Sequence, residues 1–308
     1  MAIYLTIDGG TTNTRVYLVC DGIISDSRKI SAGARDGKAA LIPALRESIS
    51  DLLNDNKLVE SDVKRIIASG MITSENGLCN LAHTTLPAGA FELSQNMHHT
   101  DIPEISSIGW SFIRGVKYVG DSIEDTDIIR GEETELMGIL DGCGEDALYI
   151  LPGSHSKHMA VDKNGKITAF KTMMSGELLA AVINNTILKT STDFEHATLI
   201  PDQLLAGFDY ATVHGINEAL FKVRILSNVF LNDKESCYSF LLGVILCDEV
   251  KAIIKHSAQR IIIGGQQQMK DALFAILTAR SDKDVEALSV DDVNNAVARG
   301  AIKIYQSK

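Results

Sequence analysis

Two stretches of this chain decide its fold: Asp8-Gly9-Gly10-Thr11-Thr12-Asn13-Thr14-Arg15, and Leu151-Pro152-Gly153-Ser154-His155-Ser156-Lys157-His158. Each stretch follows a short apolar run, residues 2–7 in the first case and 147–150 in the second, and such runs are typical of buried strands. Glycine and hydroxyl residues then end the run. The sequence therefore predicts a tight turn at the end of two separate strands.

The two stretches belong to a longer repeat with constant spacing. A second apolar run follows each turn, and each run ends in a dipeptide that favours a tight hairpin, Asp21-Gly22 or Asn164-Gly165. A single offset, with no gap, aligns four pairs of landmarks: Gly10 with Gly153, Thr11 with Ser154, Gly22 with Gly165, and Gly33 with Gly176. The sequence predicts two copies of one strand-hairpin-strand unit, each with a Gly/hydroxyl loop at its first turn.

A loop of this composition suits an anion. Successive backbone N–H groups point toward one position, glycine lets an anion approach closely, and Thr and Ser hydroxyls add donors for phosphate oxygens. Two such loops facing each other could hold a polyphosphate from both sides. The copies differ where Asp8 corresponds to Leu151, and a single carboxylate beside one phosphate loop suits a bound Mg²⁺. The alternative is that both loops are ordinary hairpin turns, because Gly-Thr-Thr is a common sequence.

Residues 7–13 resemble the first phosphate loop of the sugar kinase, Hsp70 and actin superfamily, and residues 153–155 resemble its second. Further segments, in order along the chain, are similar to the 2-dehydro-3-deoxygalactonokinase family. They are SGMITS at 69–74, RGEETE at 130–135, LPGSHSK at 151–157, MSGEL at 174–178 and FLLG at 240–243. The chain departs from the commoner family pattern at Gly9, where a Trp often stands, at Ser154, which replaces Thr, and at His158, which replaces an aromatic residue.

The resemblance implies an α/β fold of two actin-like (ribonuclease H-like) domains with a nucleotide cleft between them. It also implies an activity, the ATP-dependent phosphorylation of 2-dehydro-3-deoxy-D-galactonate at its 6-hydroxyl, with ATP and Mg²⁺ as cofactors and a small-molecule sugar acid as partner. We expect the domains at residues 1–122 and 123–308, divided in the acidic connection 121–127, with a last helix over 293–305 packing across the hinge.

The resemblance also assigns the nucleotide site. Asp8 is expected to position Mg²⁺, and Lys157 to project near the transferring phosphate. Gly264-Gly265 follows a predicted strand and lets the backbone lie flat against a ligand, at the position where adenosine packs in the superfamily. Ser154-His155 lacks the Gly-x-Ser-x-Gly elbow in which a hydrolase holds its nucleophile, which argues against a hydrolase. The residues expected to bind ATP are Gly9, Gly10, Thr11, Thr12, Asn13, Gly153, Ser154, His155, Gly264 and Gly265.

Residues 130–135 place three carboxylates and an arginine together. One interpretation is a solvated helix start, where acids suit the helix dipole. In distantly related sugar kinases, however, an acid precedes the second phosphate loop on a helix that leads to a glycine like Gly138. By this likeness the catalytic base is Glu132 or Glu133, and the choice between them stays open. The residues expected to bind the substrate are Arg15, Met71, Ser74, Arg130, Glu132, Ser175 and Glu177.

Composition narrows the class of protein. The 308 residues, 45% hydrophobic and 22% charged, suffice for two globular domains. A net charge of −11 argues against nucleic acid and anionic membranes as partners, and no apolar run approaches membrane length. The five cysteines, at positions 20, 79, 143, 237 and 247, show no paired metal spacing. With no signal-peptide pattern at the N-terminus, these features predict a cytoplasmic protein.

Hydrophobic patterning predicts the other elements. Strands are expected at 23–30, 65–69, 116–120 and 260–263, and helices at 38–55, 128–140, 177–183, 239–255 and from Met269. Residues 71–100 are the least regular part, and His98-His99 within them are expected to be solvated loop histidines, because no metal-ligand spacing surrounds them. The apolar helix over 239–255 suggests a homodimer, with burial in the core as the alternative.

Two other functions compete with the sugar-acid kinase. The first is another sugar or sugar-acid kinase of the same superfamily. The second is a non-catalytic nucleotide-gated binding protein, which would need a separate partner-binding domain, and two modules leave no room for one in this length. A sugar-responsive repressor would begin with a helix-turn-helix, whereas this sequence opens with a strand.

Overall fold

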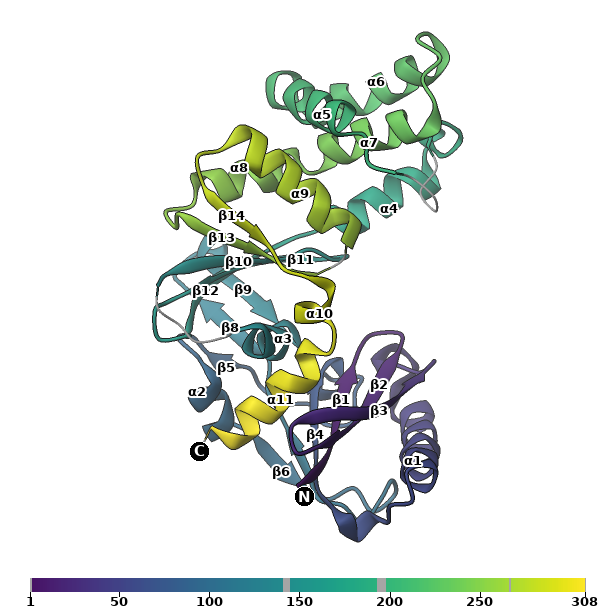
Figure 1. The fold of residues 1–308 in the computed structure, drawn as a ribbon, viewed down its shortest axis with the longest axis vertical. Coiled ribbons are helices and arrows are strands. Elements are labelled where there is room, and N and C mark those ends of the chain that lie inside the picture. The colour runs from purple at the N-terminus through teal and green to yellow at the C-terminus, as the bar shows by residue number, and fades with distance from the viewer. Residues whose placement is uncertain (1, 141–144, 193–197, 266, 308) are drawn as a thin grey trace. The chain divides into compact units, whose positions relative to one another are not determined.

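The structure is a computed structural model that describes residues 2–140, 145–192, 198–265 and 267–307 (Figure 1). Its contacts divide the chain into two compact units. Unit 1 comprises Met1–Glu145, Val161–Ala169 and Asp291–Lys308, and unit 2 comprises Asp146–Ala160 and Phe170–Val290. This division differs from the expected boundary at residue 122, because it groups residues 123–145 and the last helix with the N-terminal sheet. Cys143 lies outside the described residues.

Unit 1 is built on a six-stranded sheet with the order β3-β2-β1-β4-β7-β6. Neighbouring strands among β1, β2 and β3 are antiparallel, whereas β4 runs parallel to β1. The first predicted strand-hairpin-strand unit is therefore confirmed. The strands are β1 (Ile3–Gly9), β2 (Thr14–Cys20), β3 (Ile23–Ile30), β4 (Val63–Gly70), β6 (His98–Thr100) and β7 (Trp110–Phe112).

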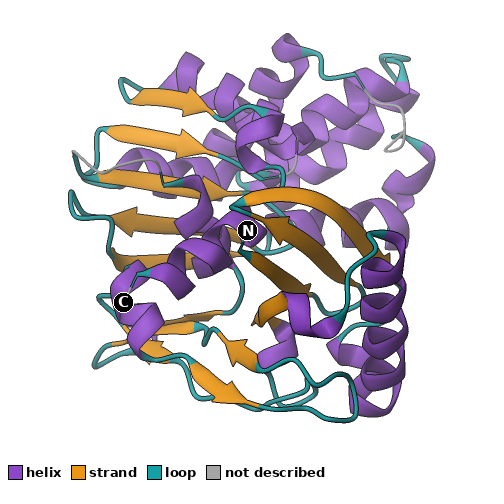
Figure 2. Ribbon diagram, turned by 60° about the horizontal axis from the view of Figure 1, so that its bottom comes forward, coloured by secondary structure: helices purple, strands orange, loops and turns teal. Residues whose placement is uncertain are grey.

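One face of this sheet is covered by α1 (Gly37–Asp55), which contacts β2 and β3 (Figure 2). Ile3, Leu5 and Ile7 alternate along β1 and lie in the same core as the buried side of α1, because successive strand residues point to opposite faces. The predicted helix over 38–55 is confirmed. Its buried side chains follow helical spacing: Leu41, Leu45, Ile49, Leu52 and Leu53.

The other face is covered by α11 (Ala296–Gln306), which contacts β1 and β4 and packs on α3 (Glu132–Ile139). The two helices cross at very short range through glycine. A Cβ at Gly138 would lie 1.9 Å from Ala296 O, and one at Gly300 would lie 1.9 Å from Thr134 O. The small residues around Gly300 permit this close packing, which joins α11 to α3 within unit 1.

Unit 2 repeats the arrangement with a five-stranded sheet of order β12-β11-β10-β13-β14. β13 runs parallel to β10, as β4 does to β1, and β14 runs parallel to β13. The second predicted copy is confirmed, because β10, β11, β12 and β13 occupy the positions of β1, β2, β3 and β4. The strands are β10 (Ala147–Leu151), β11 (Ser156–Val161), β12 (Ile167–Met173), β13 (Arg260–Ile263) and β14 (Asp284–Ala287).

The helices of unit 2 include a layer in which α5, α6 and α7 lie side by side (Figure 1). The single helix predicted over 239–255 is wrong, because the chain forms two helices that meet at Leu246. Residues 236–245 are all buried, so this apolar run belongs to the core, which was the alternative to a dimer face. The helices are α4 (Ser175–Asn185), α5 (Pro201–His214), α6 (Ile216–Asn228), α7 (Lys234–Ile245), α8 (Cys247–Lys255) and α9 (Gln267–Arg280). The short helix α10 (Val290–Val293) begins at the last residue of unit 2 and otherwise belongs to unit 1.

A small sheet completes unit 1 with β5 (Thr84–Thr85), β8 (Val116–Val119) and β9 (Thr126–Ile129), and α2 spans Ala90–Gln95. The helix predicted over 128–140 begins only at Glu132, because β9 pairs with β8 up to Ile129. The histidines predicted in a loop lie in β6, and His99 Nδ1 is 2.8 Å from Ser111 Oγ. Among the described helices, none combines the length and apolarity that crossing a bilayer requires.

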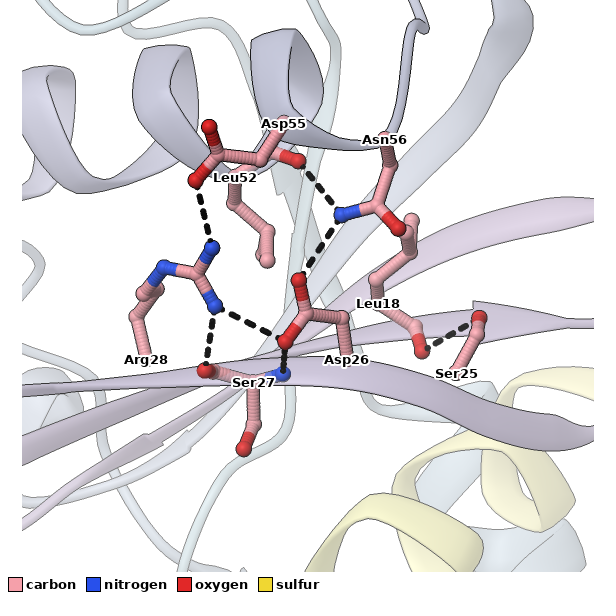
Figure 3. Close-up of polar contacts among 8 residues, drawn as sticks. All are labelled: Leu18, Ser25, Asp26, Ser27, Arg28, Leu52, Asp55 and Asn56. Carbon is pink, nitrogen blue, oxygen red and sulfur yellow. Dashed lines mark hydrogen bonds and ion pairs between the residues drawn. The ribbon is translucent and has the colours of Figure 1, made fainter.

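Asp26 on β3 ties the edge of the sheet to the end of α1 (Figure 3). Its carboxylate accepts hydrogen bonds from Asn56 Nδ2 and Arg28 Nη1, both at 2.8 Å. The Asn56 contact, followed by the Arg28 contact, holds the pKa of Asp26 below its ordinary value. A depressed pKa stabilises the fold above the unfolded-state value, and this stabilisation is lost as the pH falls through the folded-state value.

We expect Asp26→Asn to lower the melting temperature by about 1–3 °C at neutral pH, a small effect because the pair is partly exposed. The difference from wild type should shrink as the pH falls below about 4, where the wild-type carboxylate is protonated as well. Thermal unfolding across pH measures both. Glu47→Gln, at an exposed position of α1, is the control. An equal fall in the melting temperature of that variant would contradict a stabilising role for the contacts of Asp26.

Candidate functional site

The first loop, which joins β1 to β2, has its carbonyl groups bonded back into unit 1. Gly10 O accepts a hydrogen bond from Ala34 N at 3.0 Å, and Thr11 O accepts one from Arg35 N at 2.9 Å. Gly33 lies so close to the loop that a Cβ at this position would be 2.4 Å from Thr11 O. The segment after β3 therefore clamps the loop, and the clamp requires glycine at position 33.

The second loop, which joins β10 to β11, is clamped in the same way. Ser154 O accepts a hydrogen bond from Glu177 N at 2.9 Å. A Cβ at Gly176 would lie 2.2 Å from Gly153 O. Gly176 is the counterpart of Gly33 in the repeat, so the predicted repeat extends from the loops to the glycines that hold them.

A glycine with positive φ closes each loop from the neighbouring parallel strand. Gly70 at the end of β4 has φ 82°, and a Cβ there would lie 2.6 Å from Gly9 O. Gly265 after β13 has φ 74°, and a Cβ there would lie 2.5 Å from Pro152 O. Gly9 and Pro152 are counterparts in the repeat, so the two copies make the same contact. The sequence offset alone does not reveal this equivalence, because Gly70 and Gly265 are farther apart in the chain than the other paired landmarks.

Each loop leaves backbone N–H groups unbonded. Gly10 N donates to Asn13 O at 2.9 Å. At three positions in each loop, the backbone N–H has no acceptor among the residues that the structure describes: Thr11, Thr12 and Asn13, and Gly153, Ser154 and His155. Carbonyls turned inward and amides left unbonded are the arrangement with which a backbone binds anions. The side chains of Thr11, Thr12, Ser154 and His155 are exposed.

Asp8, the penultimate residue of β1, lies beside the first loop on the face away from the α1 core. In the sheet, Asp8 lies opposite Arg15 on β2 and opposite Ser69 on β4. Burial raises the pKa of Asp8, Arg15 opposes this, and the nearby Glu132 raises it further. Ser69 Oγ is buried and has no partner among the described residues. A cation bound at this position would favour the ionised form of Asp8, which burial and Glu132 disfavour.

Sequence analysis did not select two residues on this face. Burial raises the pKa of Glu135 to about 7, and Glu132 and Asp8 add to this. Burial also raises the pKa of Tyr17, Asp8 adds to the effect, and Arg15 opposes it. Periodicity could have found both, since Glu135 stands one helical turn after Glu132 on α3 and Tyr17 shares a face of β2 with Arg15.

The two candidate bases differ in what their carboxylates contact. Glu133 is fully buried: its Oε2 accepts from Gly131 N at 2.7 Å and its Oε1 from Thr134 Oγ1 at 2.9 Å. Burial, with Glu132 adding to it, raises the pKa of Glu133 to about 7. Glu132 is only partly buried, and its Oε2 accepts from Arg130 N at 3.1 Å. Glu133 thus closes the start of α3, whereas Glu132 belongs to the acidic face that it forms with Asp8 and Glu135.

Arg130 directs its guanidinium to the segment that follows β4. Its Nη1 donates to Thr73 O at 2.7 Å and to Thr73 Oγ1 at 2.6 Å, and its Nη2 donates to Leu81 O at 3.1 Å. The same Nη2 is 3.1 Å from His83 Nε2, and burial chiefly lowers the pKa of His83 to about 4, so that the ring is neutral at pH 7. Arg130 therefore fastens this segment to the start of α3.

The segment held by Arg130 contains two of the residues expected to bind substrate. Met71 and Ser74 are partly buried, and Ser74 Oγ donates to Met71 O at 2.6 Å. Arg15 is exposed on β2. Arg15 lies opposite Asp8 in the sheet, and the charges of both Arg15 and Glu132 act on Asp8. Within unit 1, the structure thus brings Asp8, Arg15 and Glu132 together beside the first loop.

In unit 2, the polar side chains around the second loop point in different directions. His155 Nε2 lies 2.5 Å from Glu177 Oε2, and both side chains are about half exposed. Lys157 is buried and its Nζ donates to His155 O at 2.9 Å. Ser175 is buried and donates its hydroxyl to Glu249 on α8, so this hydroxyl is directed into the core. Glu249 is a further residue that sequence analysis missed.

Gly264 and Gly265 directly follow β13, beside the strand that leads into the second loop. Gly264 N donates to Ile150 O at 2.9 Å, and α9 begins at Gln267. The contact of Gly265 with Pro152 gives this glycine a structural role beside the second loop. The contact of this segment with adenosine stays a prediction.

Comparison with known proteins gives the same fold and a family. A model of the 2-keto-3-deoxy-galactonokinase family matches residues 8–304. The chain is 25% identical over 296 residues to the 2-dehydro-3-deoxygalactonokinase of Escherichia coli (strain K12), covering 94% of this chain and 91% of the relative. A crystal structure of a candidate 2-dehydro-3-deoxygalactonokinase from Sinorhizobium meliloti superposes with a TM-score of 0.77 at 20% identity, covering 98% of this chain and 97% of that one.

A more distant structure supports the fold class alone. Component A of the (R)-2-hydroxyglutaryl-CoA dehydratase of Acidaminococcus fermentans superposes with a TM-score of 0.53 at 14% identity, covering 100% of this chain and 99% of that one. The predicted class, α/β with two actin-like domains, is confirmed by these neighbours and by the repeated sheet order. Since the family match extends over almost the whole length of the chain, this protein belongs to the 2-keto-3-deoxy-galactonokinase family.

Proposed function

We propose that this protein is an ATP-dependent kinase that phosphorylates the 6-hydroxyl of 2-dehydro-3-deoxy-D-galactonate. Family membership and the name of the Escherichia coli relative support the reaction. The observation that carries the proposal is the duplicated loop, because each copy has its carbonyls bonded inward and offers unbonded N–H groups to phosphate oxygens.

In this proposal, each loop binds phosphate oxygens of ATP through its unbonded amides and through the exposed hydroxyls of Thr11 and Thr12 in the first loop and Ser154 in the second. Adenosine lies near Gly264-Gly265. The ammonium of Lys157, bonded to the carbonyl of His155, adds positive charge at the second loop. His155 is a donor in that loop rather than a base.

The residues present fit a magnesium ion that is held mainly by the nucleotide. In the described part of the chain, no three His, Cys, Asp or Glu side chains form a metal-binding group. Mg²⁺ usually takes one or two carboxylates, with substrate phosphates and water completing its shell, and Asp8 beside the first loop suits this role. When bound, the ion neutralises charge that develops on the transferred phosphoryl group.

We assign the general base to Glu132 rather than Glu133, because both carboxylate oxygens of Glu133 are engaged at the start of α3. Glu132 orients the 6-hydroxyl and takes its proton while the hydroxyl oxygen attacks the γ-phosphorus. The bond to the β–γ bridging oxygen breaks, and ADP leaves. Positioning supplies about 7–11 kcal/mol of the barrier. The base contributes about 10²–10⁴-fold.

Arg130 is proposed to act on the sugar acid through the segment that carries Met71 and Ser74. Arg130→Lys removes the planar fork that reaches Thr73 and Leu81 together. We expect the KM for the sugar acid to rise about tenfold, with the KM for ATP unchanged, in steady-state kinetics. Arg114→Lys is the matched control, since Arg114 also donates to backbone carbonyls in unit 1. A larger change in the KM for ATP would contradict this role.

The proposed function is tested by measuring acceptor-dependent ADP release from ATP and Mg²⁺ across sugar acids and neutral sugars. Phosphorus-31 NMR then maps the position of the new phosphate. Turnover fastest with 2-dehydro-3-deoxy-D-galactonate and phosphate at carbon 6 is the expected result. Turnover with a hexose or N-acyl sugar instead would favour another kinase of the superfamily. ATP binding with no acceptor-dependent ADP would favour the nucleotide-gated binding protein.

A further inference from the structure

Glu249 is a buried carboxylate that the proposed reaction does not use. It lies on α8 with 1% of its surface exposed. Its Oε1 accepts from Ser156 Oγ at 2.5 Å and lies 3.0 Å from His158 Nε2, and its Oε2 accepts from Ser175 Oγ. Three side chains from β11 and α4 thus converge on one carboxylate.

The contacts of Glu249 outweigh the cost of burying it. Burial disfavours its charged form, but the hydrogen bond and charge of His158, with the hydroxyls of Ser156 and Ser175, hold the pKa of Glu249 below its ordinary value. The carboxylate is therefore ionised at neutral pH. A charged, fully hydrogen-bonded group in the core fixes the position of every group bonded to it.

These contacts reach both sides of the second loop. Ser156 is the first residue of β11 and directly follows His155, where the loop ends. Ser175 is the first residue of α4 and directly precedes Gly176, the glycine that lies against Gly153. Glu249 therefore joins the exit of the loop to the segment that clamps it.

Unit 1 makes the corresponding connection without a carboxylate. Thr14 is the first residue of β2 after the first loop, and its Oγ1 donates to Ala32 O at 2.8 Å. Ala32 is the counterpart of Ser175 in the repeat, since each directly precedes the glycine that clamps its loop. Both copies of the repeat thus join the start of the second strand to the segment after the third, directly in unit 1 and through Glu249 in unit 2.

We propose that Glu249 is a positioning residue that holds the second phosphate loop in its ATP-binding shape through Ser156 and Ser175. The inference rests on the proposed function, because it takes ATP as the ligand of this loop. It predicts that loss of the carboxylate weakens ATP binding more than sugar-acid binding. Most of the residues expected to bind the sugar acid, among them Arg15, Met71 and Ser74, lie in unit 1, and the hydroxyl of Ser175 in unit 2 is already bonded to Glu249.

The kinetic test is Glu249→Gln, which keeps the shape of the side chain and removes its charge. We expect the KM for ATP to rise about tenfold and the KM for the sugar acid to stay within about twofold of wild type. Ser156→Ala removes one contact with a smaller risk of unfolding and should raise the KM for ATP less. Asp248→Asn, at the exposed neighbouring position on α8, should leave both values unchanged. Folded Glu249→Gln protein with an unchanged KM for ATP, or with both KM values raised equally, would overturn the proposal.

A second measurement separates this inference from the proposed function. Amide hydrogen exchange of the free protein should become faster in Glu249→Gln at residues 156–158, where β11 begins, and at Glu177 and Leu178, whose amides are bonded to Ser154 O and Met174 O, with residues 8–14 unchanged. This readout needs no turnover. Unchanged exchange at these residues refutes the positioning role even where the wild type is an active kinase. An inactive wild type refutes the kinase while exchange still tests the role of Glu249.

Discussion

Asp8→Asn is expected to lower kcat by about 10²–10³-fold, because the variant no longer places a negative charge beside the phosphates to hold Mg²⁺. The same variant should unfold at the same temperature as wild type or at a higher one. Burial and Glu132 raise the pKa of Asp8 above its unfolded value, so its ionised form at neutral pH costs stability. Asparagine removes that cost.

Opposite changes in activity and stability identify a functional carboxylate, whereas a structural one would lose both together. Single-turnover kinetics at saturating ATP and thermal unfolding of the same preparation measure the two. Asp51→Asn, exposed on α1 of the same unit, serves as the control for a lost negative charge. Near-normal kcat in Asp8→Asn, with magnesium still required, would remove Asp8 from the metal site.

The sequence could predict the repeat because its signals are local. Glycine and hydroxyl residues in the loops, hairpin dipeptides and alternating apolar residues each follow from backbone or side-chain geometry over a few positions. The equivalence of Gly33 and Gly176 was visible for the same reason, and the structure adds that both lie against the loop of their own copy. The strands β3 and β4 and the helix α1 were predicted by the same patterns.

The parts that were missed depend on contacts between distant segments. Glu249 meets Ser156 and Ser175 only after α8 packs beside the second sheet, and nothing in its own neighbours in sequence marks it. Periodicity extended the helix at α3 back to Ile128, but pairing of β9 with β8 took those residues into a strand. Tertiary pairing overrides local pattern at such positions.

The choice between Glu132 and Glu133 was open in the sequence, since both precede the same glycine by similar distances. Contacts now separate them into a partly buried carboxylate on the acidic face and a buried one that closes α3. Glu132→Gln is therefore expected to lower kcat by about 10²–10⁴-fold, with the KM for ATP close to wild type and a melting temperature at neutral pH equal to or above that of wild type. Glu133→Gln should keep kcat within about tenfold of wild type.

The two variants should also differ in how their stability depends on pH. The pKa of Glu133 is raised to about 7, so the folded state binds a proton that the unfolded state releases near the ordinary value of 4.5. Stability from this group is present below pH 4.5 and is lost as the pH rises toward about 7 and beyond. Glu133→Gln removes this dependence and should flatten the melting temperature between about pH 5 and 8. The contribution of Glu135, whose pKa is also raised to about 7, remains.

Two measurements on wild type and both variants decide which of the two carboxylates is the general base. They are the melting temperature at closely spaced pH values and kcat at each pH. Glu132→Gln should lose its activity at every pH. Because Glu132 raises the pKa values of Asp8, Glu133 and Glu135, this variant should be as stable as wild type or more stable at neutral pH. Glu133→Gln should depart from the wild-type stability curve with its activity largely kept. If the roles are exchanged, so that Glu133→Gln abolishes turnover at unchanged stability, Glu133 must leave its contacts with Gly131 and Thr134 during the reaction, and the start of α3 has to move when the substrates bind.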